Sequence, residues 1–223
     1  MSGTNAFPGQ MFISADQNAM PGGQRRRGFV RALRSMYAGD RPHVEKAMIA
    51  GTDPVAFRRY QATDYSSVAS LWTRINRELA PAGMEELFER YIATTIDGEL
   101  KQLLEVFSAA KRNAFWVVED GDEVVGSFGI ESHGAGDTEL RRMYLDQGYR
   151  GKGIAQRMLD HAEAEARALG FTRMLLSTAE IQKSAVVFYR KSGFQHIRTE
   201  VAEAMNPKQA GGGLTRFHYQ KAL

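Results

Sequence analysis

The chain has 223 residues, 43% of them hydrophobic, so it can bury the core of one domain that carries an appendage. It contains no cysteine, which excludes disulfides, thiolate metal ligands and a cysteine nucleophile. Of the net charge of +3, residues 1–41 carry +4 and the remainder −1, so the basic character belongs to the N-terminal end.

Residues 1–52 are expected to be a basic extension containing Gly and Pro, partly disordered, with short helices. Its segment RRRGFVRALRSMY (residues 25–37) has the pattern of a basic amphipathic helix that contacts a membrane or nucleic acid, although a solvated extension is the favoured interpretation. No apolar run approaches the roughly 18 residues of a membrane span, and no signal-peptide pattern is present. We therefore expect a cytoplasmic protein with no membrane partner.

The folded domain is expected to cover residues 53–223 and to begin with a strand near Val55. Asp64 then caps a helix, and a longer helical pattern follows between Met84 and Phe107, with a break at Gly98. The apolar positions of the first helix recur with a period of 3.6 residues. They are Val68, Leu71, Trp72, Ile75 and Leu79.

Two strand-like runs follow, joined by Asp120-Gly121, which predicts a hairpin. A third strand, TELRRMYL, leads through a Gly-rich turn into a helix that ends at Gly170. The strand FTRMLLST, a short helix capped by Ser184 and closed by Gly193, and two final strands complete the chain. Antiparallel strands followed by a strand-helix-strand unit indicate one mixed α/β domain.

The turn before the third helix has the sequence RGKGIA, from Arg150 through Gly151, Lys152, Gly153 and Ile154 to Ala155. Two glycines, two cations and a helix N-terminus are suited to holding a pyrophosphate through backbone N–H groups. An ordinary turn between a strand and a helix is the alternative, since the turn lacks the Rossmann and Walker patterns.

Three segments in this order and spacing resemble the GNAT superfamily of acyl-CoA-dependent N-acetyltransferases. ELRRMYL is similar to the family's fourth strand, RGKGIA fits its Q/R-x-x-G-x-G/A loop, and AVVFYRKSGF resembles its A-x-x-x-Y-x-x-x-G-F segment. The resemblance covers residues 114–194. It implies a central, mostly antiparallel sheet that splays at one parallel pair of strands, with helices on both faces, and acetyl-CoA as co-substrate.

The resemblance also implies roles for individual residues. Met143, Tyr144 and Leu145 would offer backbone groups to pantetheine, and the loop from Arg150 to Ala155 would hold the pyrophosphate. Gln182 stands where many members have an asparagine, and its amide would reach the pantetheine. Tyr189 matches the tyrosine that protonates the leaving CoA thiolate, with a core aromatic as the alternative.

A protonated amine cannot attack a thioester, so a base is expected. Glu139 matches the position that many family members use for it. The alternative is a strand-end carboxylate that faces solvent.

The leading hypothesis is acetyl transfer from acetyl-CoA to a primary amine of a small molecule or peptide. A non-catalytic, CoA-sensing module of the same fold is the alternative, and nucleic acid is an unlikely partner on charge grounds. A homodimer is left open, and no residue pattern indicates a metal. The acceptor wall is expected in NRELAPAGM (residues 76–84), with Arg77 and Glu78 as candidate contacts.

Overall fold

The computed structural model describes residues 55–134, 136–206 and 208–223. The expectations for the extension at residues 1–52, and for a domain boundary at residue 53, lie outside these residues. Within the described ranges, none of the helices has the length and apolar character needed to cross a membrane.

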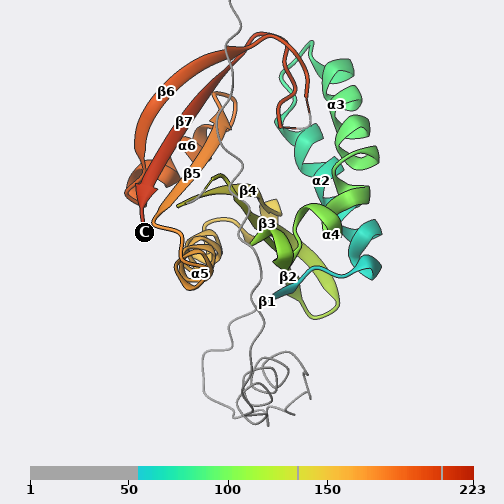
Figure 1. Ribbon diagram of the computed structural model, residues 1–223. Coiled ribbons are helices and arrows are strands. Elements are labelled where there is room, and N and C mark those ends of the chain that lie inside the picture. Colours follow the sequence, from blue (N-terminus) through green and yellow to red (C-terminus); the bar gives the residue numbers. More distant parts are fainter. Residues whose placement is uncertain (1–54, 135, 207) are drawn as a thin grey trace, which may run out of the picture. The chain divides into compact units, whose positions relative to one another are not determined.

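The strands of the described chain form a seven-stranded sheet in the order β1-β2-β3-β4-β5-β7-β6 (Figure 1). All neighbours in this sheet are antiparallel except β4 and β5, which are parallel. The strands are β1 (Ala56–Arg59), β2 (Ala114–Asp120), β3 (Glu123–Ser132), β4 (Asp137–Leu145), β5 (Arg173–Ala179), β6 (Gln195–Ala202) and β7 (Leu214–Ala222). The predicted fold class is therefore confirmed, including its single parallel pair of strands.

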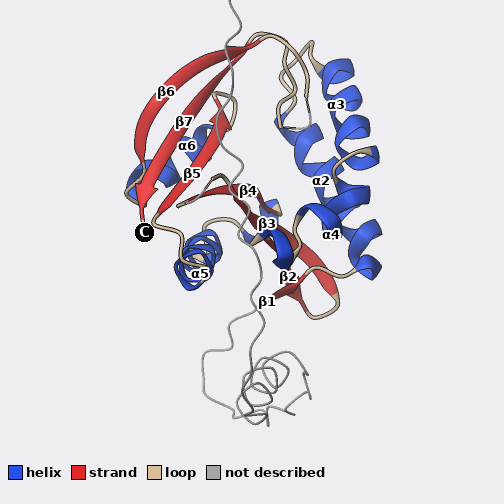
Figure 2. Ribbon diagram, viewed as in Figure 1, coloured by secondary structure: helices blue, strands red, loops and turns tan. Residues whose placement is uncertain are grey.

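Helices cover both faces of the sheet (Figure 2), with α2, α3 and α4 on one side and α5 on the other. They are α2 (Tyr65–Leu79), α3 (Glu85–Asp97), α4 (Leu103–Val106), α5 (Ile154–Ala168) and α6 (Lys183–Lys191). The predicted break at Gly98 is confirmed, because α3 ends at Asp97 and a short 3-10 turn precedes α4.

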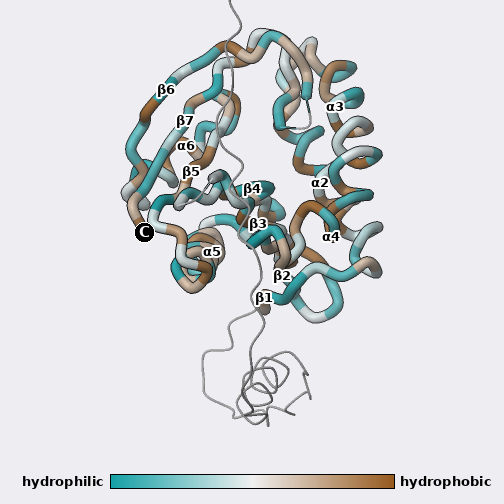
Figure 3. The backbone as a smooth tube through the Cα atoms, in the orientation of Figure 1, coloured by the Kyte–Doolittle hydropathy of each residue, from teal (hydrophilic) through white to brown (hydrophobic). Residues whose placement is uncertain are grey.

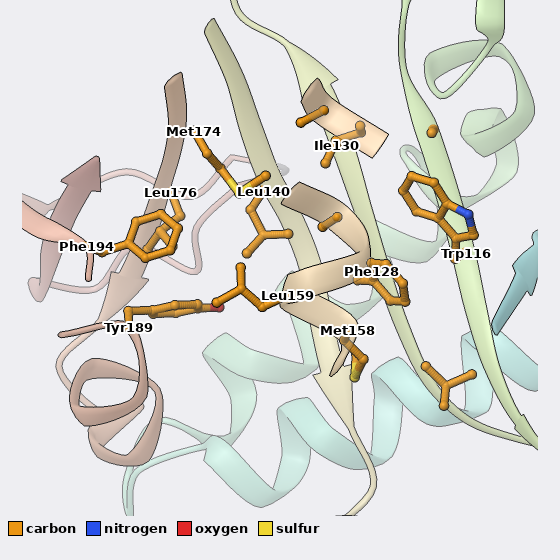
Figure 4. Close-up of a cluster of buried hydrophobic side chains, with 14 of the residues drawn as sticks. Trp116, Phe128, Ile130, Leu140, Met158, Leu159, Met174, Leu176, Tyr189 and Phe194 are labelled. Carbon is orange, nitrogen blue, oxygen red and sulfur yellow. The ribbon is translucent and has the colours of Figure 1, made fainter. Parts of the chain in front are cut away.

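The larger core lies between the sheet and α5 and also includes residues of α6 (Figure 4). The buried face of α5 carries Ile154, Met158, Ala162 and Ala166, as the helical period predicts. Aromatic rings fill the space over β2 and β3, where Trp116 stacks on Phe128 with ring centroids 5.1 Å apart. This core extends over β4 and β5, so it supports both sides of the parallel junction.

A second core lies between α2 and the other face of β2 and β3, and polar and apolar positions recur in turn along α2 and α3 (Figure 3). Of the predicted positions in α2, Val68, Leu71, Trp72 and Ile75 are buried, which confirms the helical period. A third, smaller cluster joins α3 to the loop between β6 and β7.

The start of α6 differs from the prediction. Ser184 was expected to cap this helix, but α6 begins at Lys183 and its N-cap is Gln182. The side-chain Oε1 of Gln182 accepts hydrogen bonds from Thr178 Oγ1 (2.8 Å) and Ala179 N (3.1 Å). This side chain closes the turn out of β5, so the helix begins earlier than a serine cap would allow.

Candidate active site

The sheet opens between β4 and β5. Their pairing consists of Asp137 with Arg173, Thr138 with Met174 and Glu139 with Leu175. Beyond Glu139, β4 continues to Leu145 without pairing to β5 among the described residues. The result is a wedge with the end of β4 on one side and β5 on the other.

A bulge in β4 changes the direction of the strand inside this wedge. Ser127 pairs with Tyr144 and Gly129 with Arg141, so two residues of β4 lie opposite Phe128 alone. Arg142 within the bulge has φ of 52°, a left-handed conformation that costs a non-glycine residue about 1–3 kcal/mol. Surrounding contacts must hold it.

Those contacts come from both the backbone and the side chain of Arg142. Its carbonyl accepts a hydrogen bond from Ser127 Oγ (3.0 Å), which in turn accepts one from Trp72 Nε1 (3.0 Å). Its guanidinium donates to both carboxylate oxygens of Glu99 and to the Tyr91 hydroxyl at 2.9 Å. It also lies over the Trp72 ring, 4.9 Å from the ring centroid.

Glu99 is buried between two arginines. Arg141 Nη2 lies 3.1 Å and 3.2 Å from its two carboxylate oxygens, and Arg142 binds the same carboxylate. Burial acts to raise the pKa of Glu99, but the charges of Arg142 and Arg141 outweigh it and hold the pKa below its ordinary value. Glu99 therefore stays ionised and fixes the bulge from the α3 side.

A cavity of about 140 Å³ lies at the wedge. Its wall comes from α2, α3, β4, β5, α6, β7 and the loop between β6 and β7. The residues that line it include Asn76, Leu79, Tyr91, Glu139, Arg142, Met143, Tyr144, Ser177, Gln182, Tyr189, Lys208 and Arg216. Residues far apart in the sequence therefore meet at one small, polar space.

Glu139 is the last β4 residue that pairs with β5, and it lines this cavity. Its side chain is 13% exposed, which is against the alternative of a carboxylate that faces bulk solvent. Lys208 donates to Glu139 Oε2 at 2.7 Å and lies 3.6 Å from Glu131. A ligand cation at Glu139 would compete with this half-exposed lysine.

Tyr189 projects from α6 toward β4, and its ring packs in the main core against Phe194, 5.7 Å between centroids (Figure 4). Its hydroxyl lies 3.8 Å from Met143 Sδ and lines the cavity. Burial, with a smaller effect of Tyr144, raises the pKa of Tyr189. The phenol therefore stays protonated at neutral pH and can act as a donor.

The predicted anion loop follows β4. Gly151 and Gly153 have φ of 75° and 79°, and a Cβ on either would meet no described atom within 4 Å. Gly153 is the N-cap of α5 and provides no side-chain cap, so no N-cap side chain satisfies the first N–H groups of this helix. This geometry suits close approach of a phosphate group.

The two cations of this loop have different surroundings. Arg150 donates to Leu145 O at 3.0 Å and to both carboxylate oxygens of Glu78, one of them at 3.0 Å. Lys152 Nζ lies over the Tyr149 ring, 5.2 Å from its centroid. A phosphate that binds at this loop would therefore compete with the half-exposed carboxylate of Glu78 for Arg150.

Comparison with known proteins decides the family. The profile of the acetyltransferase (GNAT) family matches residues 81–194, half of the chain. The chain belongs to the GNAT family. The resemblance inferred from ELRRMYL, RGKGIA and AVVFYRKSGF is therefore confirmed.

Relatives of this GNAT protein include the uncharacterized N-acetyltransferase YjgM of Escherichia coli (strain K12), 38% identical over 107 residues, and the IAA acetyltransferase of Azospirillum brasilense, 36% identical over 114 residues. These matches cover 47% and 50% of the chain, and 64% and 73% of the two relatives. The chain thus spans less than two thirds of the Escherichia coli protein.

Solved structures share the fold. The PaiA N-acetyltransferase of Thermoplasma acidophilum, in complex with coenzyme A, has a TM-score of 0.59 and 22% identity, over 76% of this chain and 99% of that protein. An acetyltransferase of Streptococcus agalactiae 2603 has a TM-score of 0.59 and 19% identity, over 77% and 99%. At these identities the likeness concerns the fold alone.

The structure brings some predicted site residues of this GNAT protein together and leaves others apart. Those that line the cavity are Glu139, Met143, Tyr144, Gln182 and Tyr189, whereas Leu145, Arg150, Gly151, Lys152, Gly153, Ile154 and Ala155 lie outside its lining. The second group surrounds the end of β4 and the start of α5. This division fits two subsites, one at the wedge and one at the loop.

The segment in which the acceptor wall is expected contributes only some of its residues to the cavity. Asn76 and Leu79 line the cavity, but the two charged residues between them do not. Arg77 pairs with Glu89 on the surface at 2.6 Å, and Glu78 pairs with Arg150. Successive helical positions point in different directions, so residues 76 and 79, three apart, share a face that residues 77 and 78 do not.

Sequence reasoning missed Lys208, Arg216 and the buried carboxylate of Glu99 that binds Arg141 and Arg142. Lys208 and Arg216 come from the last loop and strand, where no motif marks them, and Glu99 reaches Arg142 across 43 positions of the chain. The one available indication was the charged pair Arg141-Arg142 within an apolar strand, which implies a buried carboxylate partner. Within the described ranges, no group of three or more His, Asp or Glu side chains is arranged to hold a metal ion.

Proposed function

We propose that this protein transfers the acetyl group of acetyl-CoA directly to a primary amine. The observation that carries the proposal is that Glu139 and Tyr189 line one cavity at the point where β4 and β5 separate. Membership of the GNAT family and the N-acetyltransferase relatives support it. The fold neighbour in complex with coenzyme A supports acetyl-CoA as the donor.

Acetyl-CoA fits the two subsites by their chemistry. Backbone N–H groups at Gly151, Gly153 and the start of α5 would bind the pyrophosphate, with Arg150 and Lys152 supplying positive charge. The unpaired edge of β4 from Met143 to Leu145 would bind the pantetheine amides as an added strand. The amide NH₂ of Gln182 would donate a hydrogen bond to pantetheine, because the hydrogen bonds from Thr178 and Ala179 use only Oε1 of Gln182.

Glu139 acts as the base in this proposal. An alkyl ammonium has a pKa near 10, so at neutral pH the acceptor arrives protonated and must lose a proton before it attacks. Glu139 would attract the ammonium group in place of Lys208 and accept its proton, directly or through a water molecule. Its low exposure strengthens this attraction relative to a solvated carboxylate.

Tyr189 stabilises the leaving group in this proposal. Its hydroxyl lies beside Met143, on the strand edge that would hold pantetheine. Since burial raises the pKa of Tyr189, the phenol is a hydrogen-bond donor throughout the neutral range. It would donate to the CoA sulfur as negative charge develops there.

A pH–rate profile with an accepted amine tests both roles. In Glu139→Gln, kcat/KM should fall by roughly 10²- to 10⁴-fold near pH 7 and recover toward high pH, where the free amine is more abundant. In Tyr189→Phe, kcat should fall by roughly 10²-fold while acetyl-CoA affinity stays the same. CoA release reports the rate, and calorimetry reports binding.

Two variants outside the cavity serve as controls. Glu119 on β2 is a partly buried carboxylate paired to Arg58, and Tyr60 is a buried tyrosine, so Glu119→Gln and Tyr60→Phe should keep the wild-type profile. A loss in Glu139→Gln that is equal at every pH would show that the residue is not the base. Tight CoA binding without turnover on any amine would favour the non-catalytic, CoA-sensing module.

A further inference from the structure

Arg216 on β7 carries a buried positive charge next to the cavity. The residue is 8% exposed, and its guanidinium donates to Lys208 O (2.5 Å) and to Ser177 Oγ. Both acceptors are neutral oxygens. Among the described residues, Arg216 has no carboxylate within ion-pair distance, and its buried Nε has no hydrogen-bond partner.

The other buried arginines of the cavity show the contrast. Arg141 and Arg142 both bind the carboxylate of Glu99, and Arg141 also binds Glu131. A charge removed from water is usually paired with an opposite charge, because an unpaired one loses its solvation without compensation. Glu139 and Glu200 attract the Arg216 guanidinium without forming an ion pair with it, so a carboxylate that enters the cavity could bind its remaining N–H groups directly.

The position of Arg216 relative to Glu139 indicates which anion. Glu139 lies opposite Leu175 of β5, and Ser177, which accepts from Arg216, is two residues farther along the same strand. Residues two apart share a face of a strand and are separated by roughly 7 Å. Glu139 and the guanidinium of Arg216 therefore lie on the same face of the wedge, next to positions of β5 that are two residues apart.

We infer that the acceptor is an amine that carries a carboxylate close to its amino group, as a free amino acid does. Its ammonium group would meet Glu139, and its carboxylate would accept hydrogen bonds from the remaining N–H groups of Arg216. The inference rests on the proposed acetyl transfer for its chemistry, but the pairing with Arg216 is a binding property and can be measured separately.

Matched ligands test this pairing. Phenylalanine, phenylalaninamide and phenethylamine have the same amino group and ring but differ in the carboxylate, and the same comparison can be made with leucine, leucinamide and isoamylamine. In the wild type, kcat/KM for the amino acid should exceed that of the matching amine by at least about tenfold, since a charged hydrogen bond contributes roughly that much. In Arg216→Gln this preference should disappear, so that the ratio of kcat/KM between the amino acid and its matching amine falls to about 1.

Two further variants separate recognition from stability. Arg216→Lys should restore part of the preference, because it restores the charge without the planar fork. Arg198→Gln, on the exposed part of neighbouring β6, should keep the wild-type preference. If Arg216→Gln slows amino acids and amines by the same factor, the residue holds the loop at Lys208 and the inference is wrong. It is also wrong if the wild type prefers the amines.

A binding measurement keeps this inference distinct from the proposed function. Calorimetry with phenylalanine and phenethylamine, in the presence of desulfo-CoA so that no transfer occurs, should show at least about tenfold tighter binding of the amino acid to the wild type than to Arg216→Gln. If no ligand is acetylated but this difference is found, acetyl transfer fails and the carboxylate site stands. If acetylation occurs without this difference, the carboxylate site fails and acetyl transfer stands.

Discussion

Replacing Glu99 with glutamine should destabilise the domain far more than an ordinary charge removal does. The carboxylate is 7% exposed and binds Arg141 and Arg142, whose side chains are 9% and 5% exposed. Glu99→Gln keeps the size of the side chain but removes its charge. Arg141 retains Glu131, whereas Arg142 loses the carboxylate that accepts from its Nε and Nη2.

The magnitude follows from burial. Breaking a buried ion pair from one side costs about 3–5 kcal/mol, because the remaining charge stays desolvated. For a domain of this size, that loss corresponds to a melting temperature lower by roughly 6–20 °C. Since a domain has only about 5–15 kcal/mol of total stability, the variant should be close to unfolding in mild urea.

Urea denaturation of the wild type and Glu99→Gln measures this difference. Asp97→Asn is the matched control, because Asp97 lies two residues away and pairs with Lys101 at 2.7 Å on the surface, 69% and 57% exposed. The control should change the free energy of unfolding by less than about 1 kcal/mol. A loss in Glu99→Gln no larger than that of the control would refute the reasoning.

The pH dependence gives a second check. Because the folded pKa of Glu99 lies below its unfolded value, its charge contributes stability above about pH 4.5, and this contribution is lost as pH falls through the folded pKa. The difference between the wild type and Glu99→Gln should therefore narrow on acidification. If the difference in free energy of unfolding between the two proteins is constant from pH 7 to pH 4, the charge of Glu99 is not what stabilises the folded domain.

Two further changes have expected outcomes. Gly153→Val places a branched side chain at φ of 79° at the start of α5, and should weaken acetyl-CoA binding by at least about tenfold in calorimetry, whereas Gly121→Val, equally open at φ of 60° in the hairpin, should not. His161 packs its ring against Trp116 and its buried Nε2 has no partner, and burial lowers its pKa. The unfolded chain therefore takes up the proton first, and the stability of the folded domain should fall as pH drops below about 6.5. In thermal melts from pH 7.5 to 5, the melting temperature of His161→Phe should fall less than that of the wild type. An equal fall in both proteins would contradict this expectation.

Local patterns predicted the parts of the fold that depend on neighbouring residues. Asp120-Gly121 predicted the β2–β3 hairpin because a tight turn favours glycine at positive φ, and Gly121 has φ of 60°. The 3.6-residue period predicted the buried face of α5, since Ile154 and Met158 point to one side of any helix. Glu139 and Tyr189 came from family motifs, and the structure places both on one cavity.

The remaining features depend on contacts between distant segments. Nothing near Arg142 in the sequence indicates a left-handed bulge, because the conformation is held by Glu99, Ser127 and Trp72, which belong to other elements. The orientation of the Arg216 side chain likewise depends on a hydrogen bond to Ser177, which lies on a neighbouring strand. Such pairings depend on the assembled sheet, so spacing along the chain cannot predict them.

The parallel junction also has a mechanical consequence. Few backbone pairs join β4 to β5, whereas α5 packs Met158 and Leu159 into one core with Leu140 of β4 and Met174 of β5. The junction between the two halves of the sheet is therefore supported by the side chains packed beneath it as well as by these few backbone pairs. Because Met158 and Leu159 share their core with Leu140 and Tyr189, which line the cavity, a methyl group added or removed on the buried face of α5 would alter the cavity wall from beneath the sheet.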